Sequence, residues 1–578
     1  MSTAELNFKD YSKQIAIDFI QTVVTVDDMA YENETKPSAN IKKNIEVSTI
    51  GRLAGMTSEK TELTSIPTVI KEENKLHGFN VPKIVKAFEN KKILCSAIRP
   101  EIDKTKLTSD EFKKIALENK VNQYFPILSK ADIIILDWEF FEGDQKGEFT
   151  QGLLKKFYDE LEKLRLIIIY TGTDVRNNVL NVLQTLFEID GDIKEIEDKE
   201  CVFEKKGLRV KVVLKNETTT QKGDLNIKQC SEEELSEVCL NEFAIMTQGL
   251  ITNTTLKAIT TIRDNTYSIL SKFNSTLDAP FLTHRAFLPC PEDSEYFITE
   301  SIGQEISSLI HNLDVYDVVN IENIEKWLSH NEINNLDITY KKNDDNFLTE
   351  NKTAKEIFEK GIPTLIKLNN SSETKKCLKK TVLTKQLLKL SDSDMFKSIP
   401  DKELSVITSI QSNYKNVPFL TQGIILKKEE NSCSVTNEDL CCDCNNNDNT
   451  YYLCIQQKCD CHRIEDEGRT FLFLPLKEKR ENDNFDIIIK DNEYKYLKLV
   501  ETYNLVLKKF TPDSNNGKII AKKESVNNKY YFETCNNEKF DYISILKPIH
   551  AQKISNKIAG NLSRVGLDDT EWFRLHQG

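Results

Sequence analysis

The chain has 578 residues, of which 39% are hydrophobic and 29% are charged, and its net charge is −13. This length and composition predict a soluble protein of about three or four domains and exclude a disordered chain. The negative charge argues against nucleic acid as a partner. Because no apolar run approaches the roughly 20 residues that span a bilayer, and the N-terminus lacks a secretory signal, we expect a cytoplasmic protein without a membrane segment.

Residues 1–225 are predicted to form an α/β domain, with a polar insertion at about 31–75. Helical segments alternate with apolar strands, which are expected at residues 20–28, 91–100, 132–136, 163–173 and 207–217. Such alternation predicts a parallel, doubly wound sheet of the flavodoxin-like kind, with right-handed crossovers. The working crevice of such a sheet lies at the carboxyl ends of its strands.

Several of these strands end in chemically capable side chains, which are Asp27, Asp28, Asp137, Thr171 and Lys215. Taken alone, Asp137 after the run IIIL is most simply a turn former. As a set, the carboxylates would repel one another and need a cation, and hard oxygen ligands suit Mg²⁺. A carboxylate can attack phosphorus, while a nearby hydroxyl and ammonium hold the phosphoryl oxygens.

These segments resemble the receiver domain of two-component response regulators over roughly residues 16–220. VDD matches the metal-binding acidic pair of the family, at Asp27 and Asp28, and IIILDW matches its phosphoacceptor strand, at Asp137. IIIYTGT matches the strand with the phosphate-sensing hydroxyl, at Thr171, and VVLK the strand with the phosphate-binding lysine, at Lys215. The resemblance implies transfer of a phosphoryl group from a kinase phosphohistidine to Asp137 with Mg²⁺, in a phosphoacceptor and not a turnover enzyme.

The segments also depart from the receiver pattern. The acidic pair lies 110 residues before Asp137 (137 − 27), and Lys215 is followed by Asn216, where the family usually has proline. A hairpin is predicted within CVFEKKGLRVKVV, and no aromatic switch residue is found on the fifth strand. A non-catalytic pseudo-receiver scaffold that docks a kinase or another partner is therefore the alternative. A phosphatase of the haloacid-dehalogenase type is a third reading, but it needs an aspartate where this chain has Glu139.

The rest of the chain adds a wider resemblance. Segments such as YYLCIQQKCDCHRI, RTFLFLPL and VGLDDTEWFRLHQG, with the stretch that begins LITNTTLKAITTIRD, resemble receiver proteins of the bacterial antiphage two-component defence system called Detocs. The resemblance implies a histidine-kinase-like partner and a second receiver or effector protein in the same system. Because no effector enzyme is recognisable in this chain, a phosphate buffer or a regulator is the role that fits.

Three further regions are expected after the α/β domain. Residues 226–345 are predicted to be a helical domain that begins at a capping sequence, SEEE, and residues 346–430 a helical connecting region. The latter includes helices at TAKEIFEKG and TKQLLKL and ends in a strand. His284 and His311 have no spaced metal-ligand partner, so both are expected to be structural.

Residues 431–578 are predicted to be a β-rich domain, a barrel or a twisted antiparallel sheet, with a terminal helix. Cysteines crowd the region from Cys433 to Cys461. Thiolates bind Zn²⁺, and the candidate ligands are Cys441, Cys444, Cys459 and Cys461. The spacing lacks paired CxxC knuckles, so free thiols are the alternative.

Overall fold

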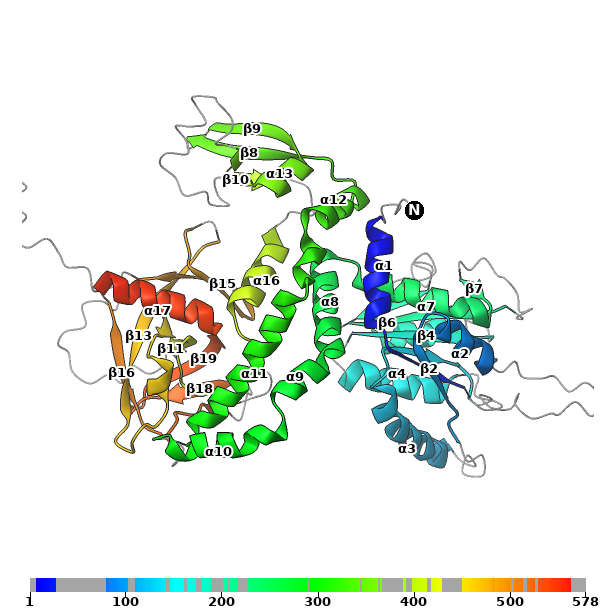
Figure 1. Ribbon diagram of the computed structural model, residues 1–578, viewed down its shortest axis with the longest axis horizontal. Coiled ribbons are helices and arrows are strands. Elements are labelled where there is room, and N and C mark those ends of the chain that lie inside the picture. The colour runs from blue at the N-terminus through cyan, green and yellow to red at the C-terminus, as the bar shows by residue number, and fades with distance from the viewer. Residues whose placement is uncertain are drawn as a thin grey trace, which may run out of the picture. The chain divides into compact units, whose positions relative to one another are not determined.

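The computed structural model (Figure 1) divides the chain into two compact units, Met1–Asn335 with Thr353–Leu365 and Leu336–Lys352 with Ile366–Gly578. The structure describes residues 7–27, 80–101, 110–140, 146–160, 164–172, 179–188, 201–205, 207–216, 227–289, 291–343, 346–361, 364–365, 388–390, 398–412, 417–428, 450–481, 483–500, 504–512, 517–524 and 529–562. The predicted insertion at about 31–75 lies outside these residues.

The N-terminal part of the first unit is built on a mostly parallel sheet. Its strands are β1 (Thr22–Val26), β2 (Leu94–Ile98), β3 (Ile133–Leu136), β4 (Arg165–Thr171), β5 (Val202–Lys205), β6 (Leu208–Lys215) and β7 (Gln229–Cys230). They lie in the order β2-β1-β3-β4-β6-β5, with β7 on β6, and every pair is parallel except β5 and β6. The order β2-β1-β3-β4-β6 is the doubly wound, flavodoxin-like one. The predicted parallel sheet and the hairpin are both confirmed.

Helices cover both faces of this sheet. One core packs the strands against α3 (Asp110–Leu128), α4 (Glu148–Glu160) and α5 (Asn181–Leu186). The other packs them against α1 (Phe8–Phe19), α2 (Val81–Glu89) and α7 (Glu232–Thr247). Because both faces are covered, all four residues of β3 are buried, as expected of a central parallel strand.

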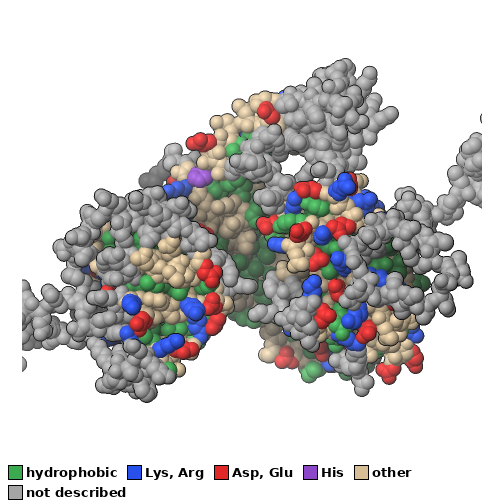
Figure 2. Space-filling model, turned by 180° about the vertical axis from the view of Figure 1, so that it is seen from behind, with side chains coloured by type: hydrophobic (Ala, Val, Ile, Leu, Met, Phe, Trp, Pro, Cys, Tyr) green, Lys and Arg blue, Asp and Glu red, His purple; other side chains and the backbone are tan. Residues whose placement is uncertain are grey.

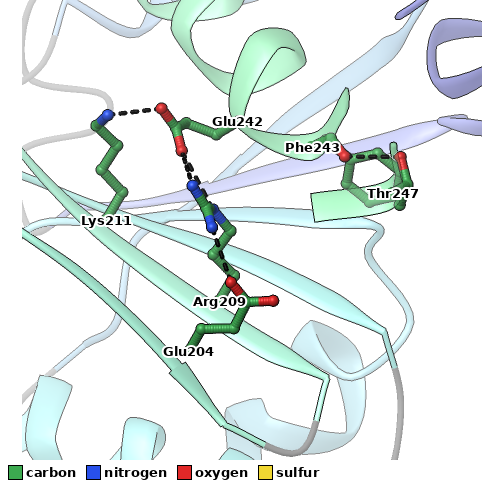
Figure 3. A network of polar contacts seen from close by, with 6 residues as sticks. All are labelled: Glu204, Arg209, Lys211, Glu242, Phe243 and Thr247. Carbon is green, nitrogen blue, oxygen red and sulfur yellow. Dashed lines mark hydrogen bonds and ion pairs between the residues drawn. The ribbon is translucent and has the colours of Figure 1, made fainter. Parts of the chain in front are cut away.

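Charged side chains join β6 to α7 inside this second core (Figure 3). Lys211 Nζ donates to Glu242 Oε1 at 2.6 Å, and Arg209 Nη2 donates to Glu242 Oε2 at 2.7 Å. The other end of the Arg209 guanidinium reaches Glu204 Oε2 at 2.8 Å. The side chain of Lys211 is 1% exposed and that of Glu242 is 7% exposed. The Glu242 carboxylate of α7 therefore pairs with two cations of β6, Lys211 and Arg209, where little water reaches them.

Most of the middle of the chain is helical, as predicted, but the predicted helical range, residues 226–345, also contains strand β8 (Asn335–Asn343). Helix α7 begins at the predicted cap, where Ser231 and Glu234 form a capping box. After it come α8 (Leu250–Asp264), α9 (Thr266–Lys272), α10 (Asp278–Phe287), α11 (Asp293–Asn312), α12 (Ile321–His330) and α13 (Ala354–Lys360), with 3₁₀ turns η4 (Ser275–Leu277) and η5 (Val315–Val319). His284 and His311 are exposed.

The second unit includes a small sheet in the order β10-β8-β9, formed by β8 (Asn335–Asn343), β9 (Asn346–Thr353) and β10 (Leu388–Leu390). A helix is predicted over TKQLLKL, residues 384–390, and this prediction is wrong at Leu388–Leu390. These residues pair instead with β8, Leu388 opposite Tyr340 and Leu390 opposite Ile338. A short apolar run is compatible with both the helical period of 3.6 residues and the strand period of 2, so periodicity alone could not distinguish a helix from a strand here.

A larger antiparallel sheet confirms the predicted β-rich C-terminal part. Its order is β14-β15-β13-β12-β11-β19-β18-β17, with β16 on β13. The strands are β11 (Ile424–Lys428), β12 (Thr450–Cys454), β13 (Arg469–Lys479), β14 (Ile487–Asp491), β15 (Glu493–Leu499), β16 (Val506–Phe510), β17 (Lys522–Lys523), β18 (Tyr530–Glu533) and β19 (Lys539–Ile545). Helices α16 (Ser398–Ser409) and α17 (Pro548–Leu562), with the short η7 (Lys458–Cys461), accompany the sheet.

The substitution Glu242→Gln tests the charged contact between β6 and α7. It removes the carboxylate that serves Lys211 and Arg209, and loss of one partner from a buried ion pair costs about 3 kcal/mol or more in unfolding free energy. The matched control is Glu204→Gln, whose side chain is 50% exposed and for which we expect a loss below about 1 kcal/mol. Urea unfolding of both variants measures the difference, and equal losses would contradict a dominant role for Glu242.

Candidate functional site

Two aspartates meet where the parallel strands β1 and β3 end. Val26 pairs with Leu136 in the sheet register, and Asp27 and Asp137 directly follow these residues. The Asp137 amide donates to Val26 O at 3.1 Å, and the Asp27 amide donates to Ile98 O at 3.2 Å, so the ladder continues through both aspartates. The chain leaves β1 toward β2 on one side and returns as β3 on the other, and this switch point is where such sheets bind ligands. Asp27 is fully buried and Asp137 is 7% exposed.

Lys215 reaches this edge from the end of β6. Its Nζ donates to Asp137 Oδ2 at 2.9 Å, and the two side chains are 8% and 10% exposed. The second carboxylate oxygen, Oδ1, accepts a hydrogen bond from the Trp138 amide at 2.7 Å. Both oxygens of Asp137 are therefore held by positive or polar groups, which fixes the carboxylate in one orientation.

Thr171 ends β4 between the strands of Asp137 and Lys215. The register pairs Leu136 with Ile169 and Thr171 with Leu214, so the threonine lies one residue beyond the strand position beside Asp137. Thr171 is 1% exposed. The structure thus brings Asp27, Asp137, Thr171 and Lys215 to the same edge of the sheet.

Asp28, the other member of the acidic pair, lies outside the residues that the structure describes. Within the described ranges, no three His, Cys, Asp or Glu side chains form a group that could hold a metal ion. The two buried carboxylates, Asp27 and Asp137, are nonetheless hard oxygen donors on neighbouring strands, and this donor set suits Mg²⁺ and not a soft metal.

The loop after β3 contributes residues that the sequence patterns do not single out. The hydroxyl of Thr150, on α4, donates to the backbone carbonyl of Asp137 at 2.8 Å. Trp138 is fully buried. Gly147 has a φ of 61°, and a Cβ at this position would lie 2.5 Å from Cε2 of the Trp138 indole. The peptide that carries Asp137 is therefore held by the Thr150 hydroxyl and is followed by a closely packed indole.

Tyr170 supplies an aromatic ring next to the lysine. Lys215 Nζ lies 5.9 Å from the centroid of this ring, and the tyrosine hydroxyl donates to Cys230 O at 3.0 Å. The receiver pattern places its aromatic residue on the fifth strand, so it does not single out Tyr170, which lies on the fourth. Its hydroxyl connects the edge of the site to the residue before the Ser231 cap of α7.

The thiol of Cys230, which pairs with Lys215 in the sheet, is a poor competitor for an electrophile at this edge. Burial raises the pKa of Cys230 to about 12. It therefore remains protonated at neutral pH, and the thiolate is the nucleophilic form. The carboxylate of Asp137 is the better candidate nucleophile at this site.

The predicted zinc site receives no support from the described part of the chain. Cys441 and Cys444 lie outside it. Cys459 is exposed, whereas Cys461 is buried and its Sγ donates to Gln457 O at 3.2 Å. A hydrogen bond with Cys454 lowers the pKa of Cys461, so the buried thiol has a protein partner already.

Comparison with known proteins finds a similarity in the N-terminal part of the chain. The family model described as the response receiver domain matches residues 19–220. No curated protein and no solved structure matches the chain. The matched range, residues 19–220, includes all five residues that the receiver pattern selects.

Among the helices that the structure describes, none is long and apolar enough to cross a membrane. On the face seen in Figure 2, acidic and basic side chains are intermixed on the coloured surface, without a continuous basic field.

The substitution Gly147→Ala tests the packing behind Asp137. The added methyl group would meet a buried indole, and the left-handed backbone disfavours alanine, so we expect a loss of about 2–3 kcal/mol in unfolding free energy. Because Trp138 must move, its fluorescence spectrum should shift as well. Gly303→Ala, which has nothing within 4 Å of the added Cβ, is the control. An unshifted spectrum and unchanged stability in Gly147→Ala would contradict the close packing.

Proposed function

We propose that Asp137 accepts a phosphoryl group from the phosphohistidine of a partner histidine kinase, with Mg²⁺ held by Asp27, Asp28 and Asp137. The observation that carries this proposal is the buried contact of Lys215 Nζ with Asp137 Oδ2, at the strand end beside Asp27. The match of residues 19–220 to the response receiver domain supports the same chemistry.

The reaction follows from the groups at this edge. A carboxylate oxygen of Asp137 attacks phosphorus, the bond from phosphorus to the donor imidazole breaks, and its electron pair leaves with the imidazole nitrogen, which takes up a proton. The product is an acyl phosphate on Asp137. When bound, Mg²⁺ supplies positive charge that the phosphoryl oxygens and carboxylates share.

Protein groups account for the rest of the mechanism. The hydrogen bond from the Trp138 amide to Oδ1 orients the carboxylate before the reaction. Lys215 neutralises the aspartate in the resting protein, and its ammonium then pairs with the phosphoryl oxygens that replace the lost carboxylate charge. The Thr171 hydroxyl donates to another of these oxygens. Low exposure of all these groups keeps water from hydrolysing the acyl phosphate.

We further propose that the chain acts as a phosphate buffer or regulator in antiphage defence, with a second receiver or effector protein in the same system. This part of the proposal rests on the four segments outside the receiver pattern, which resemble receiver proteins of the Detocs antiphage defence system. The alternative is a pseudo-receiver that docks a kinase or another defence partner without accepting phosphate, and phosphorylation distinguishes the two.

Incubation with acetyl phosphate and Mg²⁺ tests the acceptor directly. Intact mass spectrometry should show one added phosphoryl group on the wild type, none on Asp137→Asn, and none after chelation of the metal with EDTA. Glu139→Gln, which changes a nearby carboxylate in the same way, should label like the wild type. Equal labelling of Asp137→Asn would contradict the assignment, and an unlabelled wild type would favour the scaffold. Circular dichroism checks that each variant is folded.

The role of Lys215 has its own test. Lys215→Gln removes the ammonium but keeps a polar side chain of similar length, and we expect the initial rate of labelling to fall by about 100-fold, the loss typical of one stabilising donor. Lys211→Gln, on the same strand but paired with Glu242, should label within about threefold of the wild type if it remains folded, since it lies outside the site. A rate within twofold of the wild type for Lys215→Gln would contradict the proposed role.

A further inference from the structure

The second unit contains a pocket that the receiver chemistry does not use. The pocket has a volume of about 380 Å³ and lies between helices α16 and α17 and the end of the large sheet at β14 and β15. This volume is within the range of small-molecule sites in proteins. Its three walls differ in chemistry: one is basic, one carries hydroxyl groups and one is apolar.

The basic wall is one face of α17. His550, Lys553 and Lys557 line the pocket, and their spacing of three and four residues places them on the same side of the helix. Within the described ranges, neither Lys553 nor Lys557 forms an ion pair. The acidic residue of the lining, Asp486, is already engaged, because its Oδ2 accepts from the Leu499 amide at 2.9 Å and lies 3.2 Å from Lys498 Nζ. Both lysines are exposed, and together they place two positive charges beside the pocket.

The hydroxyl wall comes from α16. Ser405, Thr408 and Ser409 line the pocket at helical spacing. Thr408 Oγ1 donates to Leu404 O at 2.9 Å, and Ser409 Oγ donates to Ser405 O at 2.6 Å. The Ser405 hydroxyl makes no hydrogen bond within the part of the chain that the structure describes, so its proton can be donated to an anionic oxygen.

Backbone contacts hold the two helical walls at a fixed separation. The Lys547 amide, just before α17, donates to Ser409 O at 2.8 Å, and the Lys547 ammonium donates to Ile407 O at 2.5 Å. The Gln411 amide, just after α16, donates to Ile545 O at 2.8 Å. Such a site needs little rearrangement to bind, which lowers the entropic cost of binding.

The third wall is apolar and determines which non-phosphate part of a ligand fits the pocket. Ile487, Ile488 and Leu546 are buried side chains of the pocket lining, and Leu499 and Ile554 complete its apolar surface. Apart from the His550 imidazole, the lining has no aromatic ring that could stack on a nucleobase. An aliphatic body is therefore favoured over an aromatic one.

We propose that this pocket binds a small organic phosphate monoester with an aliphatic body. A phosphate monoester carries a charge of about −1.5 to −2 at neutral pH, which matches the two lysines, whereas a carboxylate carries only −1 and would leave one lysine uncompensated. The phosphate lies between α17 and the hydroxyl groups of α16, and the carbon chain lies on Ile487 and Leu499.

Calorimetric titration of the full chain with n-butyl phosphate, inorganic phosphate and butyrate, at constant ionic strength, tests the proposal. We expect n-butyl phosphate to bind at least tenfold more tightly than butyrate, because of its charge, and more tightly than inorganic phosphate, because of the apolar wall. The double variant Lys553→Gln/Lys557→Gln should lose at least tenfold in affinity for n-butyl phosphate.

A matched control variant distinguishes binding at this pocket from non-specific electrostatic attraction of the anionic ligand to surface lysines. Lys479→Gln/Lys509→Gln makes the same change in net charge on exposed lysines of the same unit, and it should bind n-butyl phosphate like the wild type. Asp137→Asn should also bind normally, so a failure of the phosphoacceptor proposal leaves this one intact. Equal losses in the two double variants, butyrate binding as tightly as n-butyl phosphate, or no binding at about 10 mM would overturn the proposal.

Discussion

The buried ion pair between Asp137 and Lys215 is the contact on which the account of the receiver domain depends. Removing two charges from water is costly, and their mutual attraction often does no more than offset that cost. Such a pair is therefore weak as a source of stability. In the proposed mechanism its value lies in chemistry, because an ammonium held 2.9 Å from the carboxylate would neutralise the nucleophile before the reaction and the phosphoryl group after it.

The sheet makes this contact possible through its topology. The two residues are 78 positions apart in the sequence, and they meet because β3 and β6 both flank β4 and run in the same direction. On the other side of β3, β1 brings Asp27 to the same edge. The residues of the proposed cation and phosphate sites thus come from strand ends, and the loops add the groups that orient them.

Much of this arrangement could be predicted from the sequence. The apolar runs identify the strands, alternation with helices gives a parallel sheet, and parallel strands place their carboxyl ends on one edge, so Asp27, Asp137, Thr171 and Lys215 could be grouped before any coordinates were known. Trp138, Gly147 and Thr150 could not, because their contacts depend on how one loop folds against α4. Tyr170 was missed because it lies on the fourth strand, whereas the receiver pattern places the aromatic residue on the fifth. Lys211 within β6 gave no sign of burial, since its partner Glu242 lies on a helix that follows the strand.

The most direct measurement of the central claim is the position of the phosphoryl group. The chain is phosphorylated with acetyl phosphate and Mg²⁺ and reduced with borohydride, which converts an aspartyl phosphate to a stable alcohol, and the product is sequenced by tandem mass spectrometry. The account predicts that the reduced residue is Asp137 and no other. Reduction at Asp27, at another acidic residue, or at none would contradict it.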